Sequence, residues 1–319
     1  MSGCMGTGKK VQILLSTYNG ECYLREQLDS FLALDNFREC KVLIRDDGST
    51  DKTWPILKEY GDRFGFQVER GEHKGTNASY QWLLENSDQM CCFFAFSDQD
   101  DVWLPPKLSH AIEELERLPQ EKSLLYASRS KITDGRLRPT GDSCNPTRGV
   151  SFYNAMVQNV LPGHTQVFNA KLRDDLCRHG ILKAHVVDWW VYLVAAARGQ
   201  IRFSQTCDVL HRQHGNNAVG YKLGTLAGIQ RKLEYILQGK GNAISQQLHS
   251  FSQIYDGELP EEYQQELTNY LKGLGSLSKR LGYLRKSRVY RQEKSEDWKF
   301  RLLYAMGKYD LEQTGECGS

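Results

Sequence analysis

The sequence has no hydrophobic run long enough to cross a membrane. Its longest apolar runs, Cys91–Phe96 and Trp189–Ala197, fall far short of the roughly 18 residues that a membrane-spanning helix needs. The first ten residues contain three glycines and the pair Lys9-Lys10 but no apolar segment, so they do not have the pattern of a secretory signal. We therefore expect a cytoplasmic protein.

Paired cysteines, internal repeats and low-complexity tracts are also missing. The nine cysteines are scattered and include no CxxC pair, which argues against a zinc site, a redox dithiol or a disulfide framework. Hydrophobic residues make up 40% of the chain and charged residues 25%, a balance that excludes long disordered or fibrous regions. The chain has 319 residues, which is long enough for two structural units of about 150 residues each.

Charge is nearly balanced overall but unevenly placed. The formal net charge is +2, yet residues 279–308 contain ten basic and three acidic residues, a local charge of +7 that leaves −5 for the rest of the chain. This asymmetry indicates that the C-terminal region binds an anionic surface.

Short apolar runs alternate with amphipathic segments in the first part of the chain. The runs expected as strands are Val11–Ser16, Val42–Arg45, Phe66–Glu69 and Cys91–Phe96, and the expected helices begin near Leu24, Thr53 and Asn77. This alternation predicts an α/β fold, a mostly parallel Rossmann-like sheet with helices on both faces. Because Cys91–Phe96 is apolar throughout, we expect it at the centre of the sheet.

The pattern changes near Tyr221. Apolar residues from Leu226 to Leu237 recur at helical spacing, Pro260 with the two acids after it is typical of a helix start, and no strand pattern returns. We therefore place an α/β domain at residues 1–220, a basic helical region at 221–310 and a tail at 311–319.

Polar clusters follow three of the predicted strands: Ser16–Glu21, Asp46–Asp51 and Ser97–Asp101. In open α/β sheets, ligands bind beyond the carboxyl ends of the strands. These clusters therefore mark the expected site.

The third cluster holds three carboxylates in four residues, at positions 98, 100 and 101. Carboxylates this close repel one another, and a hard divalent cation such as Mg²⁺ or Mn²⁺ would relieve the repulsion. The alternative is a solvated turn in which Asp101 caps the next helix.

The second cluster, Asp46–Asp51, has two interpretations. Gly48 with Ser49 or Asp51 forms a tight turn and helix cap without any ligand. A carboxylate here is also suited to accept the N3–H of a uracil or thymine ring. Helix capping explains Ser49 and Asp51 but not both Asp46 and Asp47.

The three clusters, in this order and spacing, resemble the inverting family 2 nucleotide-sugar glycosyltransferases, which have the A-type glycosyltransferase fold. The resemblance covers roughly residues 10–220, which would then be the catalytic domain. Three segments make the chain most similar to bacterial rhamnosyltransferases of cell-wall or capsular polysaccharide synthesis: Ser97–Trp103, Val187–Trp190 and His211–Asn217.

The resemblance implies a role for each residue of the clusters. The nucleotide pocket would be lined by Thr17, Asn19 and Glu21, with Asp47 reading the pyrimidine. Asp98 would face the ribose, and Asp100 would hold the Mg²⁺ or Mn²⁺ that bridges the diphosphate, with Asp98 also in the metal set. The chain departs from many relatives in having His73-Lys74-Gly75 in place of Asn-X-Gly; Lys74 either contacts the phosphate or is solvated.

Further site residues are expected in the second half of the domain. Asp188 is either a helix cap or, as the resemblance implies, the base that takes the acceptor hydroxyl proton, with Trp189 or Trp190 stacking on an acceptor sugar. In the loop after the last strand, His214 would complete the metal shell and Arg212 would bind the departing phosphate, unless the loop is merely polar. Gly163–Thr165 is either a contact to the donor sugar or a turn.

Together these residues predict one in-line displacement with inversion. The expected reaction moves L-rhamnose from dTDP-rhamnose onto a hydroxyl of a lipid-linked or polysaccharide acceptor, in cell-wall, capsule or O-antigen synthesis. A UDP-hexose donor is the alternative. The basic C-terminal region, which is rich in aromatic residues, is expected to bind the anionic inner face of the membrane, the alternative being packed helices with a solvated basic face.

Three other functions remain as alternatives. A sugar nucleotidyltransferase would carry a glycine-rich, basic phosphate loop after the first strand, and Ser16–Glu21 has one glycine and no basic residue. A non-catalytic nucleotide-binding module would not need Asp98, Asp100 and Asp188 together. Nucleic-acid binding through the basic C-terminus is not expected, and the sequence does not specify an oligomeric state.

Overall fold

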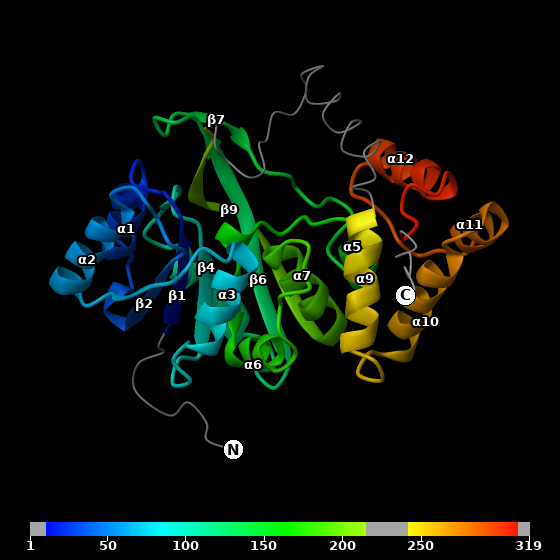
Figure 1. Cartoon of the computed structure of the whole chain (residues 1–319), viewed down its shortest axis with the longest axis horizontal. Helices are drawn as coiled ribbons and strands as arrows, with labels where there is room; N and C mark the ends of the chain where they lie inside the picture. Colours follow the sequence, from blue (N-terminus) through cyan, green and yellow to red (C-terminus); the bar gives the residue numbers. More distant parts are fainter. Residues whose placement is uncertain (1–10, 215–241, 312–319) are drawn as a thin grey trace, which may run out of the picture. The chain divides into compact units, whose positions relative to one another are not determined.

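The structure is a computed structural model that describes residues 11–214 and 242–311 (Figure 1). These residues form two compact units, one within residues 1–145 and 159–220 and the other within residues 146–158 and 221–319. Three segments lie outside the described residues: the helix predicted between Leu226 and Leu237, the first ten residues, and positions 312–319 of the predicted tail.

The first unit is built on one sheet whose strand order is β3-β2-β1-β4-β8-β6-β9-β5, with β7 paired to β6. Its first four strands are parallel, as the alternating pattern predicts. They are β1 (Val11–Thr17), β2 (Cys40–Asp46), β3 (Gln67–Arg70) and β4 (Phe93–Ser97). Every residue of β4 is buried, which confirms its predicted central position.

The other strands make the sheet mixed. They are β5 (Val102–Trp103), β6 (Ser123–Thr133), β7 (Pro139–Asp142), β8 (Val167–Asn169) and β9 (Gly199–Arg212). β8 runs antiparallel to both β4 and β6, whereas β6 and β9 are parallel. The register of β9 against β5 pairs Leu210 with Val102, so the end of β9 lies beside the Ser97–Asp101 loop.

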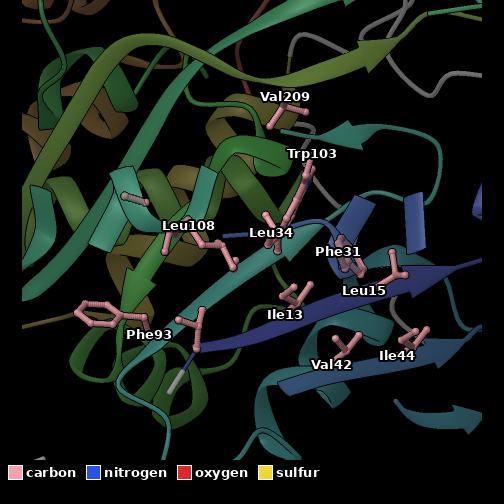
Figure 2. Close-up of a cluster of buried hydrophobic side chains, with 14 of the residues drawn as sticks. Ile13, Leu15, Phe31, Leu34, Val42, Ile44, Phe93, Trp103, Leu108 and Val209 are labelled. Carbon is pink, nitrogen blue, oxygen red and sulfur yellow. The ribbon is translucent and has the colours of Figure 1, made fainter. Parts of the chain in front are cut away.

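Helices cover both faces of this sheet. They are α1 (Leu24–Leu32), α2 (Thr53–Phe64), α3 (Thr76–Glu85), α4 (Lys107–Glu116), α6 (Ala170–His179) and α7 (Val187–Arg198), with short 3-10 helices at Phe37–Glu39 and Gly163–Thr165. Buried residues of α1, α2 and α4 share one hydrophobic core with alternate residues of β1, β2 and β4. Figure 2 shows Ile13 and Leu15 of β1 and Val42 and Ile44 of β2 in this core, near Phe31 of α1.

The alternate residues of the same strands pack on the other face. Phe94 and Phe96 of β4 contact Phe168 of β8, and Phe96 also contacts Tyr80 of α3. Burying each large apolar side chain stabilises the fold by about 1.5–3 kcal/mol. Because both faces are buried, the carboxyl edge of the sheet is the part left for polar chemistry.

The second unit is helical. Its elements are α5 (Phe152–Ala155), α9 (Asn242–Ile254), α10 (Glu261–Gly273), α11 (Leu277–Leu284) and α12 (Lys294–Ala305). The Tyr304 hydroxyl donates a 2.6 Å hydrogen bond to the Tyr270 carbonyl in its core. None of the helices among the described residues is both long and apolar enough to span a membrane.

Residues 146–158 belong to this second unit, although the sequence analysis places them within the first domain. The reason is aromatic packing. Phe152 is buried and stacks on Tyr263 with ring centroids 4.5 Å apart, and it also contacts Phe251. An aromatic side chain of this size stabilises the protein more when it is buried in the helical core than when it lies on a surface loop.

Candidate active site

Residues predicted to line the nucleotide pocket form hydrogen bonds between the ends of β1 and β2 and the loops that follow them. Thr17 Oγ1 donates to Asp46 Oδ1 at 3.2 Å, the Asn19 side chain accepts from Thr50 N at 2.9 Å, and the Glu21 carboxylate accepts from Lys52 N at 2.9 Å. Thr17 is buried, whereas Asn19 and Glu21 are exposed. The three side chains thus fix the positions of these two loops relative to each other. Their contact with a nucleotide stays a prediction.

Asp47 is almost completely buried and is surrounded by hydrogen-bond donors. Its Oδ1 accepts from the Arg45 guanidinium and from Lys74 N at 3.0 Å. Its Oδ2 accepts from Gly75 N at 2.8 Å and lies 2.9 Å from His73 Nδ1. Burial alone would raise the pKa of Asp47, but the Arg45 guanidinium and the two amide groups outweigh it and lower the pKa.

The Ser97–Asp101 loop fixes the backbone of Tyr18 through a side-chain amide. Gln99 Oε1 accepts from Tyr18 N at 2.9 Å, and Gln99 Nε2 donates to the Tyr18 carbonyl at 3.0 Å. A Cβ on Gly20 would lie 2.4 Å from Gln99 Oε1, so this arrangement requires glycine at position 20. The Tyr18 ring stacks on His73 with centroids 4.2 Å apart.

Two of the predicted metal ligands, Asp100 and His214, are in direct contact. Asp100 Oδ2 lies 2.7 Å from His214 Nε2, and both side chains are mostly buried. Burial, followed by repulsion from Asp101 and Asp98, raises the pKa of Asp100 to about 6. Desolvation also raises the pKa of Asp98, whose side chain is about half exposed (49%).

Asp101 is not the helix cap that one interpretation expected. It is fully buried, and its Oδ1 lies 3.0 Å from His211 Nδ1 and 3.1 Å from the Arg212 backbone nitrogen. His164 stacks on His211 with centroids 4.4 Å apart, and desolvation lowers its pKa to about 3. The helix that follows, α4, begins after Pro106 without a side-chain cap.

The residues around Asp100 fit a divalent cation. Asp101 Oδ2 is a buried oxygen without a hydrogen-bond partner, and the ligand atoms of Asp101, His164 and His211 all lie within 4.8 Å of one another. Carboxylate oxygens and imidazole nitrogens are ligands that Mn²⁺ and Mg²⁺ accept. These ligand types suit the predicted metal, and Asp100 with His214 offers the same types, although this pair is separate from the cluster of Asp101, His164 and His211.

Arg212, which is predicted to bind a departing phosphate, is bonded within the protein. Its guanidinium is buried, with Nε donating to the Asp100 carbonyl at 2.9 Å, one terminal nitrogen donating to the Gly135 carbonyl at 2.7 Å and the other lying 2.6 Å from Glu26 Oε2. It also covers the Tyr23 ring at 4.4 Å. Arg212 therefore helps to position the Ser97–Asp101 loop, and its contact with a phosphate stays a prediction.

Asp188 lies in the first turn of α7, one residue inside the helix rather than at its cap. Its Oδ2 accepts from Gly163 N at 3.0 Å and its Oδ1 from Trp189 N at 2.8 Å. Desolvation, with a smaller contribution from the Asp98 charge, raises the pKa of Asp188 to about 6, although its hydrogen bonds oppose the rise. A carboxylate with this pKa is ionised at neutral pH and accepts a proton readily.

The neighbouring tryptophans belong to the core. Trp190 has no exposed surface and Trp189 has only 9%. Trp190 therefore does not stack on an acceptor sugar as predicted, because its ring is enclosed by protein. For Trp189 the acceptor contact stays a prediction.

Several residues of the site were not predicted as such. Tyr18 lies within the cluster Ser16–Glu21 and Arg45 ends the predicted strand Val42–Arg45, but the sequence assigns neither of them a contact. His164 was noted within Gly163–Thr165 without a metal or packing role. A polar residue inside an apolar strand, such as Arg45 in β2, is a signal that could have shown a buried charge pair.

The sequence is similar to a known family and to several curated proteins. Residues 12–173 match the family model described as Glycosyl transferase family 2. The dTDP-rhamnosyl transferase RfbG of Shigella flexneri is 28% identical over 243 residues, which cover 68% of this chain and 77% of that protein. An uncharacterized protein of Mycobacterium tuberculosis is 26% identical over 210 residues, 65% of this chain and 59% of that protein.

Solved structures are similar in fold. S. aureus TarS 1-349 in complex with UDP has a TM-score of 0.57 at 18% identity, with 94% of this chain and 88% of that chain covered. The mannosyltransferase PcManGT from Pyrobaculum calidifontis, in complex with GDP-Man and Mn²⁺, has a TM-score of 0.53 at 15% identity, covering 94% and 86%. The α/β sheet with its flanking helices is thus the fold of A-type glycosyltransferases.

Proposed function

The chain belongs to glycosyl transferase family 2, and we propose that it transfers a sugar from a pyrimidine nucleoside diphosphate to a hydroxyl acceptor with inversion. The observation that carries this proposal is Asp188. It is a partly exposed carboxylate held by two backbone amides, with a pKa of about 6. These are the properties of a general base that works at neutral pH.

The proposed step is a single displacement. The acceptor oxygen attacks the anomeric carbon while the bond from that carbon to the diphosphate oxygen breaks, and the diphosphate leaves with the electron pair. Asp188 takes the proton of the acceptor hydroxyl at its carboxylate. Because Gly163 N and Trp189 N fix both oxygens, the base does not need to reorganise during the reaction, and base catalysis of this kind adds about 10²–10⁴-fold to the rate.

Asp100 and His214 would hold the divalent cation, with Asp98 nearby. When bound, the cation would neutralise charge on the diphosphate, which is typically worth several kcal/mol in the transition state. The protein's own contribution is to hold Asp100 in place. Arg212 does so by donating to the Asp100 carbonyl.

A dTDP-linked donor, with L-rhamnose as its sugar, is the specific proposal. It is supported by the similarity to dTDP-rhamnosyl transferase RfbG over most of both chains. A UDP-hexose is the competing donor, since TarS has been solved with UDP-GlcNAc and UDP. Titrating the protein with dTDP-rhamnose, UDP-GlcNAc and GDP-mannose in Mn²⁺ and measuring product formation decides between them. Transfer from GDP-mannose alone would contradict the pyrimidine proposal.

A lipid-linked glycan at the inner face of the membrane is the proposed acceptor. Support comes from α11 and α12, which pack together in the second unit. Trp298 and Leu302 of α12 and Met306, which caps the end of this helix, are spaced four residues apart and are exposed. Leu277 and Leu281 of α11 are exposed as well. Exposed lysines and arginines accompany them: Lys279, Arg285, Lys286, Lys294 and Lys299. Apolar side chains with basic neighbours are the chemistry that binds anionic lipid.

A further inference from the structure

The site contains an aromatic ring that the proposed reaction does not use. His73 lies in the loop between β3 and α3, and its side chain is 57% exposed. Despite this exposure, its ring stacks on Tyr18 at 4.2 Å with an angle of 27° between the planes. Its Nδ1 lies 2.9 Å from Asp47 Oδ2 and 3.2 Å from the Asp47 carbonyl oxygen.

Asp47 has no room for another hydrogen bond while His73 is in this position. A carboxylate offers about four lone-pair positions. Arg45, Lys74 N and Gly75 N fill three of them, and His73 fills the fourth. Asp47 can therefore read a base only after one of these four donors leaves.

His73 is the donor that can leave. Arg45 is buried and also bonds Ser79 and the Glu72 carbonyl, while Lys74 and Gly75 bind through the backbone. The backbone at position 73 is itself packed tightly, because a Cβ on Gly48 would lie 3.0 Å from His73 N. Rotation of the His73 side chain toward solvent thus frees Oδ2 without moving the loop.

The chemistry of His73 matches that of a pyrimidine. A carboxylate only accepts hydrogen bonds, so Nδ1 donates here, as the ring N3–H of uracil or thymine would. Both groups are flat rings with an N–H at the edge and a face that stacks on tyrosine. We propose that the His73 side chain is a stand-in for the nucleobase, which keeps Asp47 partnered and Tyr18 covered until the base of the sugar donor displaces it.

This inference rests on the proposed pyrimidine nucleotide donor. It predicts that removal of a side chain from the site strengthens nucleotide binding. Removing the ring in His73→Ala removes a competitor, so nucleotide affinity should increase. If His73 fills the position about 70–90% of the time, the Kd for UDP or dTDP falls by about three- to tenfold. His73→Asn keeps a hydrogen-bond donor but has no ring to stack, so its Kd should lie between those of wild type and His73→Ala.

The test is isothermal titration of UDP, dTDP and pyrophosphate, each with Mn²⁺, into the full chain and its variants. Pyrophosphate has no base, so its Kd should be the same in wild type and His73→Ala. His110→Ala is the matched control, because it removes another partly exposed imidazole bonded to an aspartate, Asp208, at 2.9 Å. It should leave all three Kd values unchanged.

The alternative outcomes separate this inference from the proposed function. If UDP and dTDP bind wild type but bind His73→Ala equally or more weakly, His73 is no stand-in, or it helps to hold the base, and the inference is overturned while the proposed function stands. An equal gain in pyrophosphate affinity would also overturn it, because the effect would not involve the base. If neither nucleotide binds any variant, both proposals are overturned.

Discussion

Asp100 Oδ2 and His214 Nε2 lie 2.7 Å apart, although 114 residues separate them in the chain. The contact exists because β9 pairs with β5, which follows the Asp100 loop directly. A carboxylate and an imidazole brought together in this way at the end of two strands are the centre of the proposed cation site.

Substitution at this pair should remove metal-dependent activity and leave the fold intact. We expect Asp100→Asn to abolish transfer, because the neutral amide is a poor ligand, and His214→Ala to weaken Mn²⁺ binding. Chelation should inhibit the wild type, and added Mn²⁺ or Mg²⁺ should restore it. Mn²⁺ binding is measured by titration and folding by circular dichroism, with His110→Ala as the imidazole control. Full activity after exhaustive chelation would contradict the metal proposal.

The pH profile should report Asp188. The base must be ionised to accept a proton, and its pKa is about 6. With saturating metal and sugar donor, turnover should therefore be highest above pH 7 and fall about tenfold per unit well below pH 6.

Asp188→Asn should lower turnover by at least about 10²-fold with little change in sugar donor affinity, because a base acts in the transition state. The amide oxygen can still accept from Gly163 N, so the variant should fold. The measurement is turnover together with the Kd for the sugar donor. Loss of sugar donor affinity with turnover of bound substrate retained would give Asp188 a structural role.

Arg212→Ala should destabilise the first unit. The substitution leaves the Asp100 and Gly135 carbonyl groups and the Glu26 carboxylate without this buried partner. Losing hydrogen bonds to a buried charged group costs about 1.5–3 kcal/mol, which denaturant unfolding would detect. Glu26→Gln, which alters only the half-exposed partner, should cost less than about 1 kcal/mol. An unfolding free energy equal to that of wild type, combined with lost nucleotide affinity, would contradict this structural role and support the predicted phosphate contact.

The exposed apolar side chains of Trp298, Leu302 and Met306 should mediate binding to anionic vesicles. In sedimentation with phosphatidylglycerol-containing vesicles, replacing Trp298, Leu302 and Met306 together by serine should abolish pelleting of the chain. Leu182→Ser is the control, since it removes an exposed apolar side chain in the other unit. Binding should weaken with salt, because charges are screened within about 10 Å at 0.1 M. Equal pelleting of the serine variant and wild type would exclude this surface.

Much of the first unit could be predicted from local patterns. Short continuous apolar runs in β1 and β2 indicate strands buried on both faces, and the fully apolar run at β4 indicates the centre of a sheet. The reason is that side-chain direction in a strand repeats every two residues, so neighbours in sequence carry the information. The position of the acidic clusters at the ligand-binding edge of the sheet could also be predicted, because they follow strands whose carboxyl ends meet at that edge.

Other features were decided only by tertiary structure. Whether Arg212 faces a phosphate or the Asp100 carbonyl depends on the register of β9, and whether Trp190 meets a sugar or the core depends on how α7 packs. His73 reaches Asp47 only because the loop after β3 returns to the end of β2. In each case the partner is distant in sequence, so no local pattern encodes it. The sequence by itself determined which residues carry groups that can bind a metal, accept a proton or stack on a ring. The packing of the sheet decided which of these groups are accessible to a ligand.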